Sequence, residues 1–386
     1  MNKNKYTYVA LVALLLIFTG CRDDRLLVIS EKEDLGRSTQ GQGYKGMYVL
    51  CEGAMGSNNC SLDYLDMSDE QSTAHYLRNI YSERNPSVVM ELGDVGNDIK
   101  IYGNRMWMVI NCSNKVEVVD AASCKRIGQV NIGNCRYVAF SEGYAYVSSY
   151  VGPVSLTDGS QVGRVYKVDT LTLQKMDSVE VGYQPDELEV VGNKLYVANS
   201  GGYLVGIYDK TVSVIDLTTF REERKITVGI NPHRVRSDRY GQLWVTSRGD
   251  YNDTRACLYL LTPDSHGKMQ LTGCLPQAVS DMCIVGDSLY YIGTEWSNAT
   301  YSNIITYGII NVRTHEIVTN RLSDAPELAS VRMPYGIIVN PEGRDFYVMD
   351  AKNYTSRGEL LHFNSDGTFD WRVNTGYIPA HACFLK

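Results

Sequence analysis

Polar or charged residues stand at the start of seven short, strand-like stretches of this sequence. They are Asn97 and Asp98, Arg136 and Tyr137, Asp186 and Glu187, His233 and Arg234, Ser280 and Asp281, Tyr335, and His381. If these stretches are strands that converge on one centre, their first side chains form a polar ring of mixed charge. Such a ring suits a large, amide-rich ligand better than a bare anion.

A second set of candidate binding residues lies in longer segments rich in Asn, Ser, Gly and Thr. The segments cover residues 51–59, 150–161, 200–210, 248–255, 294–303 and 350–357. Their candidate residues are Tyr150, Tyr203, Tyr208, Arg248, Tyr251, Trp296, Tyr301 and Tyr354. Rigid aromatic rings among small polar residues are typical of binding loops, because they supply contact area at low entropy cost. We therefore predict that these loops form a surface that binds a ligand or a partner.

The alternative hypothesis for the polar ring is that it catalyses a reaction. Asp98, Glu187 and Asp281 are carboxylates of the kind that bind Ca²⁺, as a calcium-dependent hydrolase would require. Arg136 and Arg234 would crowd the same centre with donors that cannot bind a cation. No G-x-S-x-G, P-loop or H-E-x-x-H motif occurs. We expect a binding protein with no catalytic residue, no required cofactor and no metal ligand, and Ca²⁺ in the central opening is the alternative.

The composition describes a folded protein that is rich in strands. Of the 386 residues, 44% are hydrophobic and 21% are charged, which excludes a disordered chain and a polytopic membrane protein. The net charge of -7 does not supply the positive charge that a nucleic-acid partner requires. Glycine is frequent, and no helix-length run of Ala, Leu, Glu and Lys follows residue 25. These features favour an all-β fold.

A short strand pattern, with an aromatic residue between apolar residues, recurs seven times along the chain. The copies are Met47-Tyr48-Val49, Met106-Trp107-Met108, Ala145-Tyr146-Val147, Leu195-Tyr196-Val197, Leu243-Trp244-Val245, Leu289-Tyr290-Tyr291 and Phe346-Tyr347-Val348. Their aromatic residues are 39 to 59 positions apart, a spacing typical of propeller blades. Tight turns precede six copies, and further strands follow, which gives four strands per repeat.

The repeats also predict how the ring closes. Residues 44–386 divide into seven repeats of about 49 residues, which leaves no second domain. The first copy has no inner strand before it, whereas residues 379–384 match inner strands such as 185–190. An unpaired strand edge is a liability, so we expect the C-terminal strand to complete the first blade. The sequence therefore predicts an all-β, closed seven-bladed β-propeller with four-stranded blades.

Residues 1–20 predict a lipoprotein signal peptide. Lys3 and Lys5 precede an apolar run at residues 8–18 that is too short to cross a bilayer. Phe18-Thr19-Gly20-Cys21 resembles a bacterial lipobox, so we expect cleavage before Cys21 and its acylation. Asp23 and Asp24 resemble the surface-export signal of Bacteroidetes lipoproteins, and residues 21–43 predict a polar tether. The expected location is the outer membrane, lipid-anchored and facing the cell exterior.

The repeats also carry a family resemblance. Stretches such as Leu195-Tyr196-Val197-Ala198-Asn199-Ser200 resemble the YVTN or YncE-like repeats of bacterial envelope propellers. With the lipobox and the acidic signal, the whole layout is most similar to the BtuG-type surface lipoproteins. That resemblance implies capture of cobalamin or a related corrinoid and its transfer to a TonB-dependent outer-membrane transporter. Propellers of one shape include enzymes and pure binders, so a scaffold for another protein or a glycan, and a lactonase-type hydrolase, remain as alternatives.

Nine cysteines follow Cys21, without a C-x-x-C pair and without a histidine at metal-ligand spacing. Cys51 with Cys60, and Cys257 with Cys274, stand where the two strands of a hairpin could bring them together. The sequence leaves open whether these two pairs form disulfide bonds.

Overall fold

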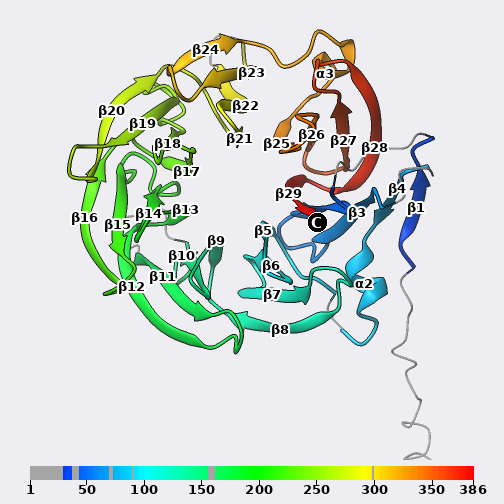
Figure 1. Cartoon of the computed structure of the whole chain (residues 1–386), viewed down its shortest axis with the longest axis horizontal. Helices are drawn as coiled ribbons and strands as arrows, with labels where there is room; N and C mark the ends of the chain where they lie inside the picture. Colours follow the sequence, from blue (N-terminus) through cyan, green and yellow to red (C-terminus); the bar gives the residue numbers. More distant parts are fainter. Residues whose placement is uncertain (1–28, 37–42, 69–72, 89–90, 155–160, 298–299) are drawn as a thin grey trace, which may run out of the picture.

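The computed structural model describes residues 29–36, 43–68, 73–88, 91–154, 161–297 and 300–386. Its strands form seven antiparallel sheets arranged as a ring around a central opening (Figure 1). Each sheet runs from an inner strand at the opening to an outer strand at the rim. The predicted all-β, seven-bladed β-propeller is therefore confirmed. Cys21, the signal peptide and much of the predicted tether lie outside the described residues.

Blade 1 joins the two ends of the propeller. Its inner strand is the C-terminal strand β29 (Pro379–Leu385), which pairs with β2 (Gly46–Cys51). The strands β3 (Ser61–Asp66) and β4 (His75–Arg78) follow toward the rim. The predicted closure by the C-terminal strand is confirmed, because β29 supplies the backbone partners that β2 would otherwise lack.

Blades 2 to 4 follow in chain order, each with its strands ordered from centre to rim. Blade 2 contains β5 (Gly96–Tyr102), β6 (Arg105–Ile110), β7 (Lys115–Asp120) and β8 (Arg126–Asn131). Blade 3 contains β9 (Cys135–Ser141), β10 (Tyr144–Ser149), β11 (Val162–Asp169) and β12 (Lys175–Tyr183). Blade 4 contains β13 (Pro185–Val191), β14 (Lys194–Asn199), β15 (Thr211–Asp216) and β16 (Arg221–Thr227).

Blades 5 to 7 complete the ring. Blade 5 contains β17 (Pro232–Ser237), β18 (Leu243–Ser247), β19 (Cys257–Pro263) and β20 (Met269–Leu275). Blade 6 contains β21 (Asp281–Val285), β22 (Ser288–Ser297), β23 (Ser302–Asn311) and β24 (Glu316–Thr319). Blade 7 contains β25 (Pro334–Val339), β26 (Phe346–Asp350), β27 (Arg357–Phe363) and β28 (Phe369–Tyr377).

Two short helices, α2 (Ile80–Arg84) and α3 (Pro326–Ala329), lie in connections between blades. Among the residues that the structure describes, no helix is long and apolar enough to cross a membrane.

The repeated aromatic residue lies in the second strand of each blade, where it packs between neighbouring sheets. Trp107, Tyr146 and Trp244 are all buried. Tyr48 shows why tyrosine serves well here, because its hydroxyl donates a 2.6 Å hydrogen bond to the carbonyl of Ala121 in blade 2. The ring removes apolar area from water while the hydroxyl binds the adjacent blade.

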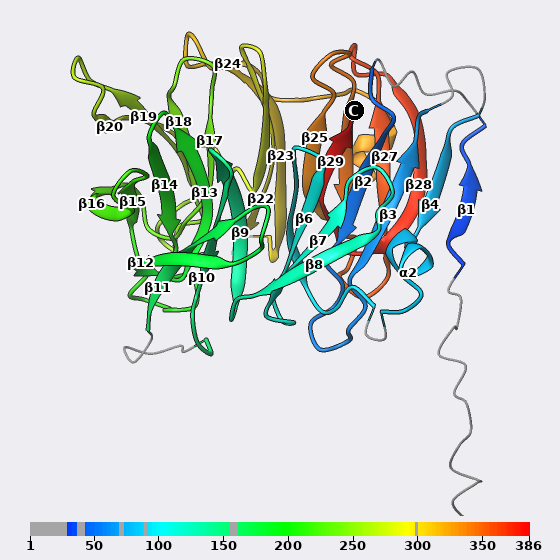
Figure 2. The ribbon, with the colours of Figure 1, turned by 60° about the horizontal axis from the view of Figure 1, so that its bottom comes forward.

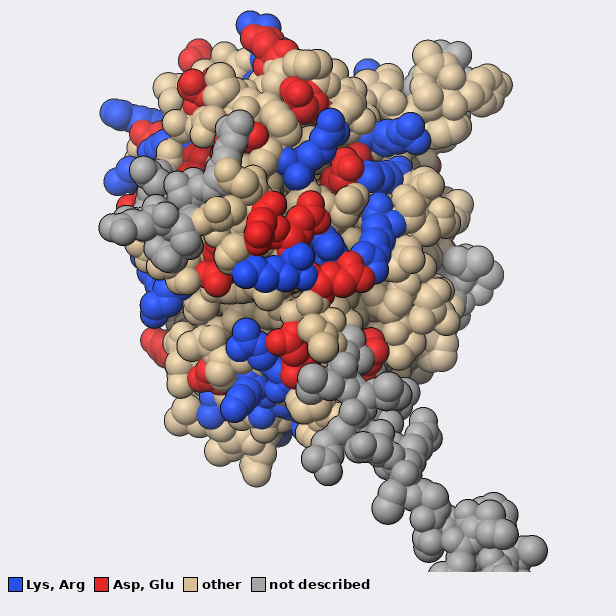
Figure 3. Space-filling model, turned by 90° about the vertical axis from the view of Figure 1, so that its right-hand side faces the viewer, with Lys and Arg blue, Asp and Glu red and all other residues tan. Residues whose placement is uncertain are grey.

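An additional strand, β1 (Glu31–Asp34), lies outside blade 1 and pairs with β4 (Figure 2). The sequence predicts a polar tether at these residues, whereas the structure places them in a strand. Arg78 on β4 holds them, with its guanidinium 3.0 Å from Glu31 and 2.7 Å from Glu33. Arg357 of blade 7 lies 2.7 Å from Glu31, and Figure 3 shows acidic and basic side chains interleaved on this side of the ring. These ion pairs hold the strand on the outer edge of blade 1.

The nine cysteines in the described part of the chain are all free thiols. Neither of the two disulfide bonds that the sequence left open is therefore formed in this structure. Cys257 instead lies with its Sγ 3.0 Å from the carbonyl of Leu275, and Cys51 lies 3.6 Å from the buried Asp63.

Candidate functional site

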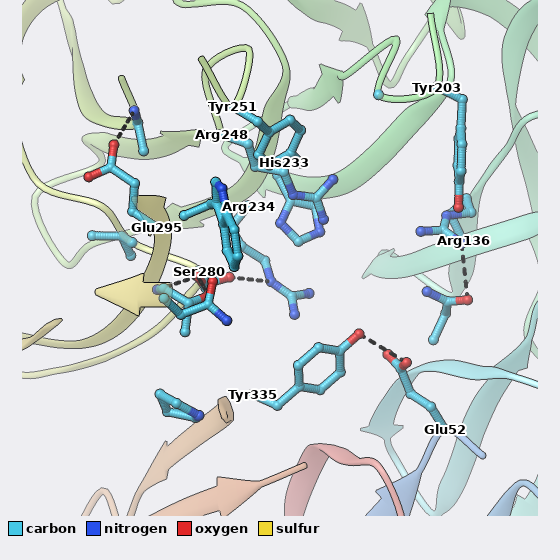
Figure 4. A pocket seen from close by; sticks show the side chains of 18 of the residues that line it. Glu52, Arg136, Tyr203, His233, Arg234, Arg248, Tyr251, Ser280, Glu295 and Tyr335 are labelled. Carbon is cyan, nitrogen blue, oxygen red and sulfur yellow. Dashed lines mark hydrogen bonds between the residues drawn. The ribbon is translucent and has the colours of Figure 1, made fainter. Parts of the chain in front are cut away.

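A cavity of about 550 Å³ opens at the centre of one face of the propeller (Figure 4). The segments after the second strand and after the fourth strand of each blade meet on this face. The first residues of the inner strands form the floor of the cavity, and the long loops form its wall. We call this cavity the mouth pocket.

The structure brings thirteen of the predicted binding residues to the mouth pocket. They are Asn97, Arg136, Tyr137, Tyr150, Tyr203, His233, Arg234, Arg248, Tyr251, Ser280, Trp296, Tyr335 and Tyr354. The remaining predicted residues lie elsewhere. Asp98, Asp281 and His381 line a second cavity of about 460 Å³ farther along the inner strands.

Asp186 and Glu187 are fully buried behind the wall of the mouth pocket. Tyr301 is 80% exposed and does not line the pocket, and Tyr208 does not line it either.

Three of the predicted acidic residues bind the backbone of the following blade. The pairs are Asp98 with the N–H of Val138 at 3.0 Å, Glu187 with Val235 at 2.9 Å, and Asp281 with Ile337 at 3.0 Å. Each donor follows a β-bulge at the start of an inner strand, where the ladder is interrupted. The carboxylates therefore join neighbouring blades. Within the described ranges no group of three or more His, Cys, Asp or Glu side chains could hold a metal ion.

Asp186 holds two arginines of the mouth pocket in place. Its Oδ1 accepts a 2.8 Å hydrogen bond from the hydroxyl of Tyr150 and a 3.2 Å bond from Nε of Arg136. Its Oδ2 lies 3.7 Å from Nη1 of Arg248. The guanidinium of Arg136 also lies 4.8 Å from the centre of the Tyr150 ring, in cation–π geometry. Arg136 is thus fixed, and Arg248 is held over the pocket.

His233 and Arg234 follow Pro232 at the start of β17 and lie beside Arg248 (Figure 4). The Nε of Arg234 lies 3.3 Å from Asp281. The Nε2 of His233 shares a 3.1 Å hydrogen bond with the hydroxyl of Tyr137. Burial lowers the pKa of His233 well below its ordinary value, and the charges of Arg248 and Arg234 lower it further. The imidazole is therefore neutral, and this wall presents guanidinium N–H groups to the pocket.

Glu52 and Tyr335 lie across the mouth pocket from these arginines (Figure 4). The hydroxyl of Tyr335 donates a 3.1 Å hydrogen bond to Glu52, whose other oxygen lies 3.5 Å from Nε2 of His381. The charge of Glu52 and burial raise the pKa of Tyr335 well above its ordinary value, so the phenol keeps its proton. This wall of the pocket is therefore acidic.

Sequence reasoning missed Glu52 as a site residue. Glu52 directly follows the second strand of its blade, as Asn111, Tyr150 and Arg248 do in theirs, and all four line the pocket. That shared position in the repeat was the available signal.

Half-exposed aromatic side chains surround the opening of the mouth pocket. Their exposed fractions are 41% for Tyr203, 55% for Tyr251, 46% for Trp296 and 39% for Tyr354. Trp296 lies near the end of the long β22–β23 hairpin, opposite Asn303. We call these four residues the aromatic rim.

Two further charged residues at the edge of the pocket were not predicted. Glu295 accepts a 2.6 Å hydrogen bond from Arg255, and both line the cavity. Glu295 lies on the β22–β23 hairpin, which is longer than its counterparts in most other blades, and Arg255 lies in the loop between β18 and β19, so no repeated pattern marks either residue in the sequence.

The fold and the site define a β-propeller with a polar pocket, rimmed by aromatic residues, at one end of its axis. The chain belongs to the family described as Domain of unknown function (DUF5074), which matches residues 45–385. No curated protein sequence matches it significantly.

Solved structures with a similar fold are distant in sequence. The periplasmic gluconolactonase PpgL of Pseudomonas aeruginosa has a TM-score of 0.60 at 13% identity, over 88% of this chain and 99% of that chain. A quinonprotein alcohol dehydrogenase-like protein of Bacteroides thetaiotaomicron has a TM-score of 0.58 at 12% identity, over 88% and 78%. Hydrazine synthase of Kuenenia stuttgartiensis has a TM-score of 0.57 at 17% identity, over 74% of this chain and 88% of that chain. At these identities the similarity shows the propeller fold alone.

Proposed function

We propose that this protein captures a corrinoid, such as cobalamin, in the mouth pocket and passes it to a TonB-dependent outer-membrane transporter. The observation that carries this proposal is the combination of a guanidinium wall with an aromatic rim. A corrinoid is a broad ring with amide side chains, so its site needs flat aromatic contacts together with hydrogen-bond donors and acceptors. Arg234 and Arg248 supply hydrogen-bond donors, and Glu52 supplies an acceptor.

The size of the mouth pocket sets how such a ligand would bind. A corrinoid is larger than a cavity of about 550 Å³, so only one side of it enters. The rest of the ring lies against the aromatic rim, where Tyr251 and Trp296 have about half of their surface available for contact. Buried aromatic anchors usually carry most of the affinity of such a contact.

The proposed location rests on the N-terminal sequence. The lipobox that ends at Cys21 supplies a lipid anchor, and Asp23 and Asp24 supply a signal for the outer face of the outer membrane. A capture protein anchored there meets its ligand before the transporter does. In this proposal the mouth pocket binds the ligand at the cell surface, and the transporter then receives it.

The proposal assigns binding, not catalysis, to the site. Arg136 is engaged by Asp186 and Tyr150, and His233 is neutral with Nε2 bonded to Tyr137. These contacts suit a rigid recognition surface, since a general base or nucleophile needs a free acceptor beside the reacting atom.

A second candidate function is an envelope scaffold that binds another protein or a glycan on the same face. The observation that favours it is the exposure of Met55 and Tyr301, at 73% and 80%. Exposed apolar and aromatic side chains beside a pocket are typical of interaction surfaces.

Calorimetric titration of the full-length chain in detergent with cyanocobalamin tests the proposal. We expect saturable binding with one site and a change in the corrinoid absorbance spectrum. Absence of heat and of any spectral change with several corrinoids, together with binding to an outer-membrane transporter or a glycan, would replace capture by the scaffold function.

A further inference from the structure

Two guanidinium groups face the mouth pocket with donors that are not used inside the described part of the protein. Arg234 is only 5% exposed, yet its Nη1 has no hydrogen-bond partner there and lies 3.9 Å from Glu187. Arg248 is 3.7 Å from Asp186, which is beyond hydrogen-bond distance. Buried donors without acceptors are costly, so a ligand that brings an acceptor is favoured here.

The charge balance around Asp186 leaves a positive excess at the floor of the pocket. The carboxylate of Asp186 faces two guanidinium groups, those of Arg136 and Arg248. Its Oδ1 already accepts hydrogen bonds from Arg136 and Tyr150. One positive charge is therefore not neutralised by this carboxylate, and Arg248 is the group that carries it toward the opening.

The positive charge of Arg234, unlike that of Arg248, is neutralised by nearby carboxylates. Glu187 binds both Arg234 and Arg236, and Arg234 also contacts Asp281. Two guanidinium groups thus meet two carboxylates. Arg234 therefore lines the pocket with an unpartnered donor without adding net charge.

The imidazole of His233 lies beside both Arg234 and Arg248 (Figure 4). Burial, followed by the charges of Arg248, Arg234 and Arg136, holds the pKa of His233 low. Burial disfavours a charge of either sign, whereas the charges of these three arginines favour a negative group at this corner. His233 therefore reports the electrostatic character of this corner of the pocket.

We propose that Arg248 and Arg234, with His233 between their side chains, form a subsite for one oxyanion group of the ligand, a phosphate or a carboxylate. Guanidinium groups bind such oxygens through paired N–H bonds in fixed geometry. The inference rests on the proposed function and narrows it. The captured molecule is one that carries an anionic group, which enters the floor of the pocket while the larger ring rests on the aromatic rim.

A pair of corrinoids that differ in one phosphate tests this subsite. Cobinamide and cobinamide phosphate are titrated separately into the full-length chain. We expect the phosphate to increase affinity about tenfold or more in the wild type, and this preference to disappear in Arg248→Gln. Arg248→Lys keeps the positive charge but loses the paired N–H donors of the guanidinium, so it should retain part of the preference for cobinamide phosphate. Equal affinity of the wild type for both corrinoids would overturn the subsite and leave corrinoid capture standing.

Inorganic pyrophosphate separates the subsite from the corrinoid proposal. We expect the wild type to bind it and Arg248→Gln to bind it about tenfold more weakly or worse. Arg239→Gln is the matched control, because Arg239 is an exposed arginine in the turn between β17 and β18, on the opposite face. Pyrophosphate binding without any corrinoid binding keeps the subsite and removes corrinoids as the ligand. No pyrophosphate binding, or equal binding by the wild type and Arg248→Gln, overturns the subsite.

The variants also need a folding control. Arg248 has a side chain that is 33% exposed and makes no hydrogen bond in the described residues, so we expect Arg248→Gln to melt close to wild type. A loss of anion binding in a variant that melts normally is then a loss of the subsite itself.

Discussion

The hydroxyl of Tyr335 donates a 3.1 Å hydrogen bond to the carboxylate of Glu52, across 283 positions of the sequence. Tyr335 belongs to blade 7, and Glu52 directly follows β2 in blade 1. The bond therefore spans the seam at which the ring closes, and both partners line the mouth pocket. Closure of the ring and the shape of the pocket are linked through this contact.

Removal of this hydroxyl should weaken the seam. We expect Tyr335→Phe to lower the free energy of unfolding by about 1–3 kcal/mol, because the largely buried Glu52 carboxylate loses a donor. Denaturant unfolding monitored by tryptophan fluorescence measures the change. Tyr301→Phe, at an 80% exposed position, is the control and should stay within about 0.5 kcal/mol of wild type. Equal stability of the two variants would contradict the role of the seam.

Deletion of residues 378–386 should abolish cooperative folding. The deletion removes β29, so the backbone groups of β2 lose their inner partners and blade 1 loses the strand at the central opening. Thermal unfolding followed by circular dichroism tests this expectation. A truncated chain that melts like wild type would show that the closing strand is dispensable.

His362 should make stability depend on pH. Burial lowers its pKa, but hydrogen bonds to Asp345 at 3.0 Å and Asp370 at 3.1 Å outweigh burial and raise the pKa above the ordinary value of 6.5. The stabilisation is fully present below about pH 6.5 and is lost as the pH rises through the folded-state pKa. The stability difference between wild type and His362→Gln should therefore be larger at pH 6 than at pH 9. Unfolding titrations at both values measure it, and a difference independent of pH would refute the charged histidine.

Replacement of Arg136 should lower the free energy of unfolding. Arg136→Met removes the hydrogen-bonded guanidinium from the fully buried Asp186 and leaves Arg248, 3.7 Å away, as its nearest cation, which we expect to cost about 1–3 kcal/mol. The double variant Arg136→Met, Asp186→Leu should recover part of that loss, because the buried carboxylate is also removed. Denaturant midpoints of both variants measure the effect, and a double variant less stable than the single one would contradict this account.

Trp296 tests the aromatic rim. We expect Trp296→Ala to weaken corrinoid binding by about 2 kcal/mol or more, since the half-exposed ring offers contact area at the opening of the pocket. Asn193→Ala, in the turn between β13 and β14 on the opposite face, should leave affinity within about 0.5 kcal/mol. Calorimetry on both variants provides the comparison. An equal loss in both would argue against binding at this rim.

The sequence by itself determined the ring. One buried aromatic residue per repeat, as in Trp107 and Trp244, with a tight turn before it, identifies the second strand of a blade. The unmatched strand at residues 379–384 then predicts the closure. These features are readable because hairpins and strand periodicity depend on residues close together in the chain.

Tertiary structure alone decided which polar side chains face the pocket and which join the blades. Asp98 and Asp281 look like site residues in the sequence, yet each binds a backbone N–H of the following blade, 40 and 56 positions away. Only its position after the second strand of a blade marks Glu52 in the sequence, and its partner Tyr335 is near the other end of the chain. The β1 strand docks on blade 1 because Arg78 and Arg357 meet Glu31 there. Such partners are fixed by the packing of neighbouring blades, and no local spacing in the sequence encodes that packing.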